Sequence, residues 1–411
     1  MSRDRITQLR ISGLRAIEDL TLALHGLTVL IGDNGTGKSS ILEALELLRL
    51  AAKPISFVQD VVSRGHGGMP ALLRRGANEL KLGVTIEGAG PPLVYEIELG
   101  LESNAQVRLS ERLGVYDESP GKDPSILLLS NPTTFLISSG AGLSNTGRRP
   151  GPGELALPRL GDGTSPMFQR AIDALEGIEI HVPFETRPTW QQREFDIRKG
   201  PRWPSEVEPT DQLQRYALNL PNAFQQLRNL GGEVWDRVIV RARLGLGDDV
   251  RDFRLSPSGR GNIELELVLG SAPDQPLPAE YLSEGQLAYL AFIALVELDE
   301  RRSVLAFDEP ELHLHPALLA RVIFMLEDAA ERAPVILATH SDRLLDALGT
   351  PERSVVLCDL DEHRTVRLRR PNEDKLAEWL EDYRGLGSLR AEGYDTYVFD
   401  SPAEPEEGES S

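Results

Sequence analysis

The segment Gly32–Ser39 reads GDNGTGKS, the GxxxxGK[ST] pattern of a loop that wraps phosphate groups with successive backbone N–H groups. It follows the apolar, β-branched run Leu27–Ile31 and precedes Ser40–Leu50, where apolar residues recur at helical spacing. A strand, a glycine-rich turn and a helix N-terminus form the setting in which such a loop holds an anion. The pattern therefore restricts the chain to an α/β fold with a nucleotide site at the end of a strand.

The loop assigns individual roles to its residues. Lys38 is expected to reach the β- and γ-phosphates, and the Ser39 hydroxyl is expected to bind Mg²⁺. The remaining nucleotide-binding candidates are Gly32, Asp33, Asn34, Gly35, Thr36, Gly37 and Ser40. The predicted cofactors are ATP and Mg²⁺.

Two later strands end in residues suited to hydrolysis. Ser303–Pro310 (SVLAFDEP) places Asp308 where a carboxylate enters the metal shell and Glu309 where one orients the attacking water. Val335–Ser341 (VILATHS) places His340 just past another apolar strand, within reach of the γ-phosphate. Glu309 and His340 are therefore the catalytic candidates.

A fourth motif, LSEGQ, occupies Leu282–Gln286 and introduces a predicted helix at Glu284–Leu298. Ser283, Gly285 and Gln286 are candidates for contacting the γ-phosphate with a second helix N-terminus. The simpler interpretation is an ordinary helix start capped by Ser283, and both interpretations can hold together.

In this order the four motifs resemble those of ABC-type ATPases. Ile6–Gly32 and Asp308–Pro316 (DEPELHLHP) are similar to the RecF, SMC and OLD-like class of DNA repair and anti-phage defence. The resemblance implies an α/β, P-loop ATPase head with an antiparallel β-subdomain and an inserted, mainly helical lobe. It also implies an ATP-dependent homodimer in which each ATP lies between the phosphate loop of one chain and LSEGQ of the other.

The expected organisation has four parts. An N-terminal ATPase lobe spans residues 1–100, an inserted lobe 101–270, a C-terminal ATPase lobe 271–370, and a helix with an acidic tail 371–411. Strands are predicted at Leu80–Ile86, Leu93–Leu101 and Gln106–Leu113, and helices at Pro166–Leu175 and within Asp211–Arg243, interrupted at Pro221 and Gly231. Residues 139–166, with seven Gly and four Pro, are predicted to be a mobile loop.

Two features of the family are expected to be missing. No heptad pattern is long enough for a coiled-coil arm, which departs from SMC proteins. The 71 residues after His340 are too few for a nuclease domain of the usual size, about 100 residues. Any nuclease activity is therefore expected to come from a partner protein.

The negative net charge of the chain argues against a surface that binds nucleic acid over most of its area. The net charge is −20, yet residues 141–260 carry 17 Arg and Lys against 16 Asp and Glu. The candidate for binding DNA is Arg187–Trp203, where basic and aromatic residues alternate, and the simpler alternative is a loop whose aromatic residues pack on the core. The single Cys358 and the absence of a signal peptide or an 18-residue apolar run predict a cytoplasmic protein without a membrane span.

Three assignments rest on position alone. Gln59 is a candidate metal-sensing glutamine, and Arg15 lies where relatives have an arginine near the nucleotide. Glu311, His313 and His315 form an acid-x-His-x-His pattern, but the spacing supplies no fourth metal ligand.

Three classes of function remain. The first is an ATP-hydrolysing dimerisation switch that acts on DNA or on an effector partner. The alternative is the ATPase subunit of an ABC transporter, against which the DEPELHLHP run argues. The third is a nucleotide-dependent scaffold with little turnover, which the retained Glu309 disfavours.

Overall fold

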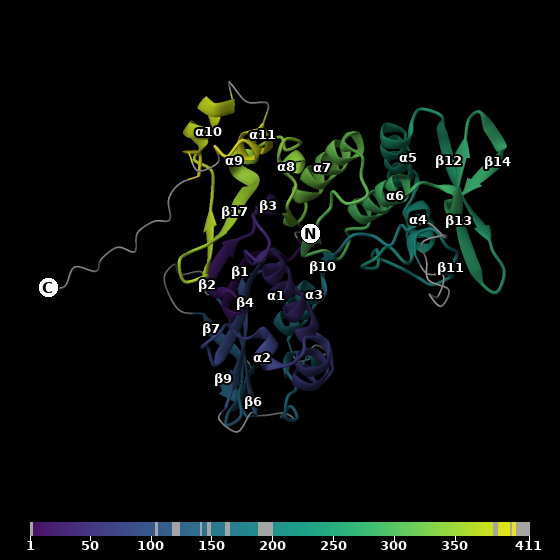
Figure 1. The fold of residues 1–411 in the computed structure, drawn as a ribbon. Coiled ribbons are helices and arrows are strands. Elements are labelled where there is room, and N and C mark those ends of the chain that lie inside the picture. The colour runs from purple at the N-terminus through teal and green to yellow at the C-terminus, as the bar shows by residue number, and fades with distance from the viewer. Residues whose placement is uncertain are drawn as a thin grey trace.

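The protein folds around a central parallel sheet, which is seen in the computed structural model (Figure 1). The structure describes residues 3–102, 106–116, 124–139, 142–145, 149–160, 165–187, 200–380, 385–394 and 397–399. Within these ranges no helix is long and apolar enough to cross a membrane.

The central sheet has six strands, and its first five are parallel. Their order is β10 (Ile178–His181), β15 (Val304–Asp308), β16 (Val335–Thr339), β3 (Leu27–Ile31), β17 (Val355–Leu360) and the antiparallel β18 (Val366–Arg369). Both faces are covered: in β16, Ile336 and Ala338 join one hydrophobic cluster, whereas Val335 and Leu337 join another. This explains the uninterrupted apolar runs, because parallel sheets are buried on both sides.

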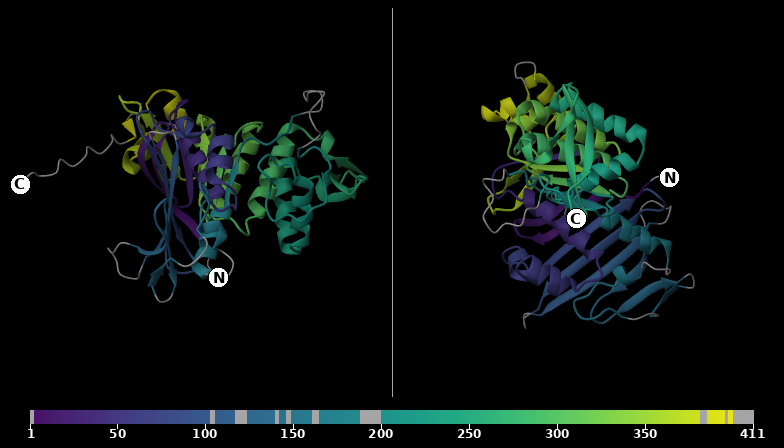
Figure 2. Two further views of the ribbon diagram at one scale, coloured as in Figure 1. Left: turned by 90° about the horizontal axis from the view of Figure 1, so that it is seen from below. Right: turned by 90° about the vertical axis from the view of Figure 1, so that its right-hand side faces the viewer.

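An eight-stranded antiparallel sheet includes the strands of the N-terminal lobe and lies at the opposite end of the molecule from the strands within residues 250–278 (Figure 2). In spatial order its strands are β2 (Ile17–Ala23), β1 (Arg5–Leu14), β4 (Glu79–Glu87), β5 (Leu93–Leu101), β6 (Val107–Val115), β7 (Ser125–Ser130), β8 (Phe135–Ser139) and β9 (Gly142–Ser144).

Helices fill the space between the two sheets. Helix α1 (Lys38–Ala51) contacts β1 and β4 of the antiparallel sheet and β10, β15 and β16 of the central sheet. It is joined there by α3 (Pro166–Glu176), and the chain between α1 and β4 forms the π-helix η1 (Phe57–Gly65) and the short α2 (Met69–Leu72). The N-terminus of α1 is thereby held at the carboxyl edge of the central sheet.

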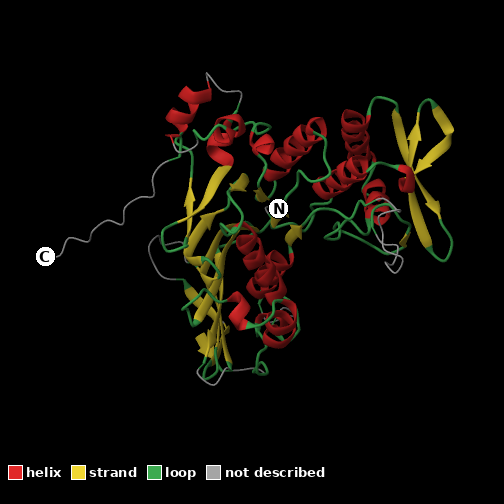
Figure 3. Ribbon diagram, in the orientation of Figure 1, coloured by secondary structure: helices red, strands yellow, loops and turns green. Residues whose placement is uncertain are grey.

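The other face of the central sheet carries the second hydrophobic cluster. Its helices are α4 (Leu220–Asn229), α5 (Gly232–Leu246), α6 (Glu284–Glu297) and α7 (Pro316–Ala330), and the first two contact a small antiparallel sheet. That sheet contains β11 (Ser205–Glu206), β12 (Val250–Pro257), β13 (Asn262–Leu269) and β14 (Ala272–Pro278). Figure 3 shows these strands projecting beyond the helices.

Short helices complete the C-terminal part. They are α8 (Asp342–Leu345), α9 (Pro351–Ser354), α10 (Glu373–Leu380) and α11 (Leu386–Ala391). Two 3-10 turns, η2 (Leu157–Arg159) and η4 (Ala279–Tyr281), precede α3 and α6 respectively.

The inserted region over 101–270 contains strands in addition to the helices α3, α4 and α5. Strands β6 to β9 extend the antiparallel sheet, β10 is an edge strand of the central sheet, and β12 to β14 form hairpins beside α4 and α5. The four-residue β10 is too short to read from periodicity, and only its pairing with β15 identifies it.

The predicted mobile loop at 139–166 lies partly outside the described residues. Its described part includes β9 and the segment Leu155–Leu157, whose three side chains are buried. The buried carboxylate of Glu111 accepts hydrogen bonds from the N–H groups of Ala156 (2.6 Å) and Leu157 (3.1 Å). The Gly- and Pro-rich composition of residues 139–166 therefore did not reveal that Leu155–Leu157 packs on the core.

Pro221, which was expected to interrupt a helix, lies instead in the first turn of α4.

Candidate functional site

The phosphate loop follows β3 and ends in α1, as the sequence predicts. Gly35 and Gly37 have φ angles of 83° and 92°, in the left-handed region that favours glycine. A Cβ on Gly37 would lie 2.6 Å from Cγ2 of Val366, and one on Gly32 would collide with the carbonyl oxygen of Cys358. Strands β17 and β18 therefore support the loop from behind. Among the described residues no side chain caps α1, so its first N–H groups face the loop.

Lys38 lies inside the loop with a side chain that is almost fully buried. Its Nζ donates hydrogen bonds to the carbonyl oxygens of Gly32 (2.7 Å) and Asp33 (2.9 Å) and lies 3.4 Å from Nδ1 of His340. Burial lowers the pKa of Lys38, and the acidic groups of Cys358, Asp308 and Asp33 oppose that shift. The ammonium group is thus held where the phosphates of a nucleotide would meet it.

The two metal-binding candidates lie next to each other. The Oγ of Ser39, in the first turn of α1, donates to Oδ2 of Asp308, at the end of β15, across 3.3 Å. Burial raises the pKa of Asp308, as does Glu309, whereas the Ser39 hydrogen bond and the charges of Lys38 and His340 lower it. A cation between these two oxygens would lower the raised pKa of Asp308.

The donor set fits Mg²⁺ better than a metal held by protein ligands alone. No group of three or more His, Cys, Asp or Glu side chains suited to a metal occurs among the described residues. Mg²⁺ commonly binds through one or two protein oxygens and completes its shell with water and substrate phosphates. Ser39 and Asp308 would supply those protein oxygens, and the ion would neutralise phosphate charge.

Glu309 and His340 approach each other at the same edge of the sheet. The Oε1 of Glu309 lies 3.9 Å from Nε2 of His340, and the Glu309 N–H donates to the carbonyl oxygen of Ala338 at 2.7 Å. Glu309 has a φ of 51°, a left-handed conformation that is uncommon for a residue with a side chain. Such strain is characteristic of functional positions, and here it directs the carboxylate toward His340.

A hydrogen-bonded pair behind His340 was not predicted from the sequence. Thr339 Oγ1 donates to Oε1 of Glu311 (2.6 Å) and accepts from the N–H of Ser341 (2.9 Å). Burial raises the pKa of Glu311, while the Thr339 hydrogen bond lowers it. Glu311 therefore fixes the backbone on both sides of His340, and only its place in DEPELHLHP gave a signal.

The acid-x-His-x-His pattern does not converge on one point. Glu311 bonds to Thr339, the Nδ1 of His313 lies 2.8 Å from Glu284, and the Nδ1 of His315 accepts from the N–H of Ala317 (3.3 Å) at the start of α7. The three side chains have separate structural partners.

Gln59 and Arg15 lie in segments that contact α1. Gln59 is in the first turn of η1, which begins after the C-terminal end of α1 and packs against that helix. Arg15 Nη2 pairs with Glu43 (2.9 Å), which also contacts His66 Nδ1 (2.8 Å). Among the described residues Gln59 makes no hydrogen bond to Ser39 or Asp308, its expected partners at the metal.

The LSEGQ motif starts α6, which is buried on all sides beyond its first turn. Ser283 Oγ accepts from the Gln286 N–H (3.3 Å), and Gln286 Oε1 accepts from the Ser283 N–H (2.9 Å), which is a capping box. Ser283 is exposed, and a Cβ on Gly285 would lie 3.0 Å from the His313 carbonyl oxygen. Within the described ranges, no hydrogen bond or ion pair joins this motif to residues 32–40.

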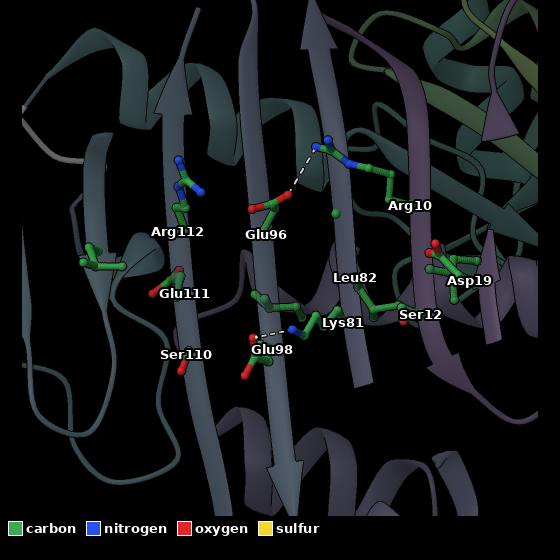
Figure 4. Close-up of a pocket in the computed structure, with 14 residues that line it drawn as sticks. Arg10, Ser12, Asp19, Lys81, Leu82, Glu96, Glu98, Ser110, Glu111 and Arg112 are labelled. Carbon is green, nitrogen blue, oxygen red and sulfur yellow. Dashed lines mark ion pairs between the residues drawn. The ribbon is translucent and has the colours of Figure 1, made fainter. Parts of the chain in front are cut away.

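A second hollow lies on the open face of the antiparallel sheet, away from these motifs (Figure 4). It has a volume of about 400 Å³ and is crossed by ion pairs between Arg10 and Glu96 (3.5 Å) and between Lys81 and Glu98 (3.3 Å). Its lining contains three basic side chains and four acidic ones, which does not favour an anion such as a nucleotide.

Fold and motifs together define an ABC-type ATPase head of the RecF, SMC and OLD-like class. Residues 5–64 match the family described as AAA ATPase domain, and residues 250–346 match the family described as AAA domain, putative AbiEii toxin, Type IV TA system. The first match contains the phosphate loop, and the second contains LSEGQ, Asp308, Glu309 and His340.

Individual relatives agree with this class. The Septu protein PtuA of Bacillus thuringiensis is 28% identical over 106 residues, which are 24% of this chain and 26% of that protein. The chain thus matches about a quarter of the length of that relative. Among solved structures, an SmcHead bound to the C-winged helix domain of ScpA has a TM-score of 0.53 at 12% identity, covering 91% of this chain and 99% of that one.

An Smc head domain with an extended coiled coil, bound to the C-terminal domain of ScpA from Pyrococcus furiosus, is similar as well. Its TM-score is 0.52 at 12% identity, with 92% of this chain and 99% of that chain covered. At this identity the likeness concerns the fold, which is that of an SMC head.

Proposed function

We propose that the chain binds Mg·ATP and hydrolyses it at a site shared by two copies in a head-to-head dimer. Lys38 and the loop amides hold the phosphates, Ser39 and Asp308 hold Mg²⁺, Glu309 orients the attacking water, and His340 contacts the γ-phosphate. Loss of the γ-phosphate removes the contact between the copies, so hydrolysis opens the dimer.

The convergence of distant motifs carries this proposal. Lys38 and His340 are 302 positions apart in the chain, yet their side-chain nitrogens are 3.4 Å apart. Ser39 and Asp308 are 269 positions apart and share a hydrogen bond. A site built only for stability would not bury an ammonium group on loop carbonyls beside an imidazole, because burial disfavours its charge.

The position of LSEGQ supports a second copy. Ser283 is exposed at the start of a buried helix and, among the described residues, makes no bond to the phosphate loop of its own chain. A helix N-terminus favours anions, and a γ-phosphate presented by another copy is the ligand that the family resemblance implies.

Nucleotide binding is tested with Lys38→Ala. Removing the ammonium group takes away a direct phosphate contact, and calorimetry should show at least a hundredfold weaker ATP binding. Lys53→Ala is a matched control, because Lys53 follows α1 and pairs with Glu176 at 2.8 Å, away from the loop. ATP binding equal to the unmodified chain in Lys38→Ala would remove Lys38 from the site.

The shared site is tested with Glu309→Gln. This variant should bind ATP without turnover and should elute as a dimer in size-exclusion chromatography with ATP, and as a monomer without it. Adding Ser283→Arg to the same chain should prevent the dimer, and Glu331→Gln, an exposed change at the end of α7, should leave turnover intact. A Glu309→Gln chain that stays monomeric in saturating ATP would contradict the dimer.

We further propose that this switch controls an effector protein in anti-phage defence. The similarity to PtuA supports this pathway. Within the candidate nucleic-acid segment, residues 188–199 lie outside the described residues, and Arg202 and Trp203 are buried, with Arg202 donating to the carbonyl oxygens of Glu280 and Leu282 (both 2.7 Å). Arg202 and Trp203 are therefore not available to contact DNA.

The pathway is tested in infected cells. Cells that express the chain with the products of its neighbouring genes should form fewer plaques, and Lys38→Ala should restore plaque formation. Equal plaque numbers with and without the functional chain would contradict a defence role. ATPase activity that rises severalfold with DNA alone would point to nucleic acid as the direct partner.

A further inference from the structure

The C-terminal helix α11 packs on the element that follows His340. Leu386 and Leu389 are fully buried, and the N–H and Oγ of Ser388 donate to the Asp346 carboxylate, both at 3.0 Å. A Cβ on Gly387 would collide with the carbonyl oxygen of Asp342, so the two backbones are in close contact. Because α8 begins at Asp342, two residues after His340, α11 is fixed beside the catalytic edge of the central sheet.

Arg390 extends from α11 toward the phosphate loop. Its Nη1 donates to Oδ1 of Asp342 at 2.6 Å, and its Nη2 lies 3.8 Å from Oδ1 of Asp33. The Arg390 side chain is only 17% exposed, whereas that of Asp33 is 93% exposed. The guanidinium is therefore held firmly on the α8 side and loosely on the side of the loop.

The positive charge of Arg390 acts on Lys38 in the nucleotide site. Burial is the largest cause that lowers the pKa of Lys38, and the positive charge of Arg390 acts in the same direction. The two cations thus repel each other across the loop. A triphosphate in the loop would attract both, and a guanidinium binds phosphate oxygens with a planar pair of N–H donors.

On the basis of the proposed nucleotide binding, we propose that Arg390 is a further nucleotide-binding residue. When ATP binds, Arg390 leaves Asp33 and contacts the terminal phosphate, and it keeps its hydrogen bond to Asp342. ATP thereby becomes linked to α11 through the same side chain that binds α8. The C-terminal segment, which lies far from the four motifs in the sequence, then responds to whether the third phosphate is present.

The inference is tested by comparing ATP and ADP binding in Arg390→Ala by calorimetry. ATP binding should weaken about tenfold and ADP binding less than twofold, since ADP lacks the phosphate concerned. Arg390→Lys, which keeps the charge but loses the planar pair of donors, should be intermediate for ATP. Arg370→Ala removes an equal charge from the far end of β18, where Arg370 donates to the Arg353 carbonyl oxygen (3.0 Å), and should change neither affinity.

Equal ATP affinities in Arg390→Ala and the unmodified chain would overturn the inference, as would equal losses for ATP and ADP. Hydrogen exchange provides a test on the unmodified chain, should Arg390→Ala fail to fold. ATP, but not ADP, should slow amide exchange in α8 and α11, and identical exchange with the two nucleotides would also overturn it. If the unmodified chain binds no ATP, the proposed function itself is contradicted. That result differs from the outcomes that overturn only the role of Arg390, in which the unmodified chain does bind ATP.

Discussion

Replacing Gly37 by alanine should separate two requirements of the phosphate loop, its backbone conformation and its close contact with β18. Gly37 has a φ of 92°, and a left-handed conformation costs a residue with a Cβ about 1–2 kcal/mol. The new Cβ would also lie 2.6 Å from Cγ2 of the buried Val366, and overpacking of a core typically costs about 1–3 kcal/mol. Gly37→Ala should therefore lower the free energy of unfolding by about 2–5 kcal/mol.

Two further variants separate the cost of the backbone conformation from the cost of the contact with Val366. Gly35 has a φ of 83°, and no described atom lies within 4 Å of the position that a Cβ would take there, so Gly35→Ala should show the conformational cost alone. Val366→Ala removes the colliding methyl groups, so the double variant Gly37→Ala/Val366→Ala should recover about 1–3 kcal/mol relative to additivity. Urea unfolding measures each change in stability. Additive losses, within about 0.5 kcal/mol, would refute the contact between β18 and the loop.

Two other predictions concern the carboxylates of the half-buried Glu311 and the buried Glu111. Glu311→Ala should lower ATP turnover about tenfold with unchanged ATP affinity, because His340 loses its positioning through Thr339, whereas Glu311→Gln keeps an acceptor and most of the activity; phosphate-release assays check both. Burial raises the pKa of Glu111 to about 6 from 4.5, so its folded form binds a proton more tightly than its unfolded form. The stabilisation is complete below pH 4.5 and is lost as the pH rises through 6, by about 2 kcal/mol. Relative to Glu111→Gln, the unmodified chain should lose that amount between pH 4 and 7 in urea unfolding, and a constant difference would contradict the shift.

The core of the site was readable from the sequence because each motif is local. The phosphate loop, the acidic strand end and the strand before His340 each carry their own apolar run and end in the functional residue. Parallel strands bring their carboxyl ends to one edge, so the convergence of Lys38, Asp308 and His340 follows from the class of fold. The strands at 79–87 and 93–101 were likewise predicted from alternation.

The remaining features depend on contacts between distant residues. The support of Gly37 by Val366 and the place of Arg390 beside Asp33 arise from C-terminal segments that carry no motif. Gln59 was assigned by its position in the chain, and among the described residues it makes no hydrogen bond to Ser39 or Asp308. The β12 to β14 hairpins were missed because short strands beside helical segments leave a weak periodic signal.

The burial of α6 determines how motion at Ser283 can spread. The helix packs against α4, α5 and α7, the hydroxyl of Tyr289 donates to the Arg241 carbonyl oxygen (2.8 Å), and a Cβ on Gly245 would collide with the Tyr289 ring. A close-packed interior transmits strain because it cannot yield locally. A push on Ser283 from an opposing copy would therefore be passed through α6 to α4, α5 and α7, and α4 and α5 are the helices that contact β12 and β13.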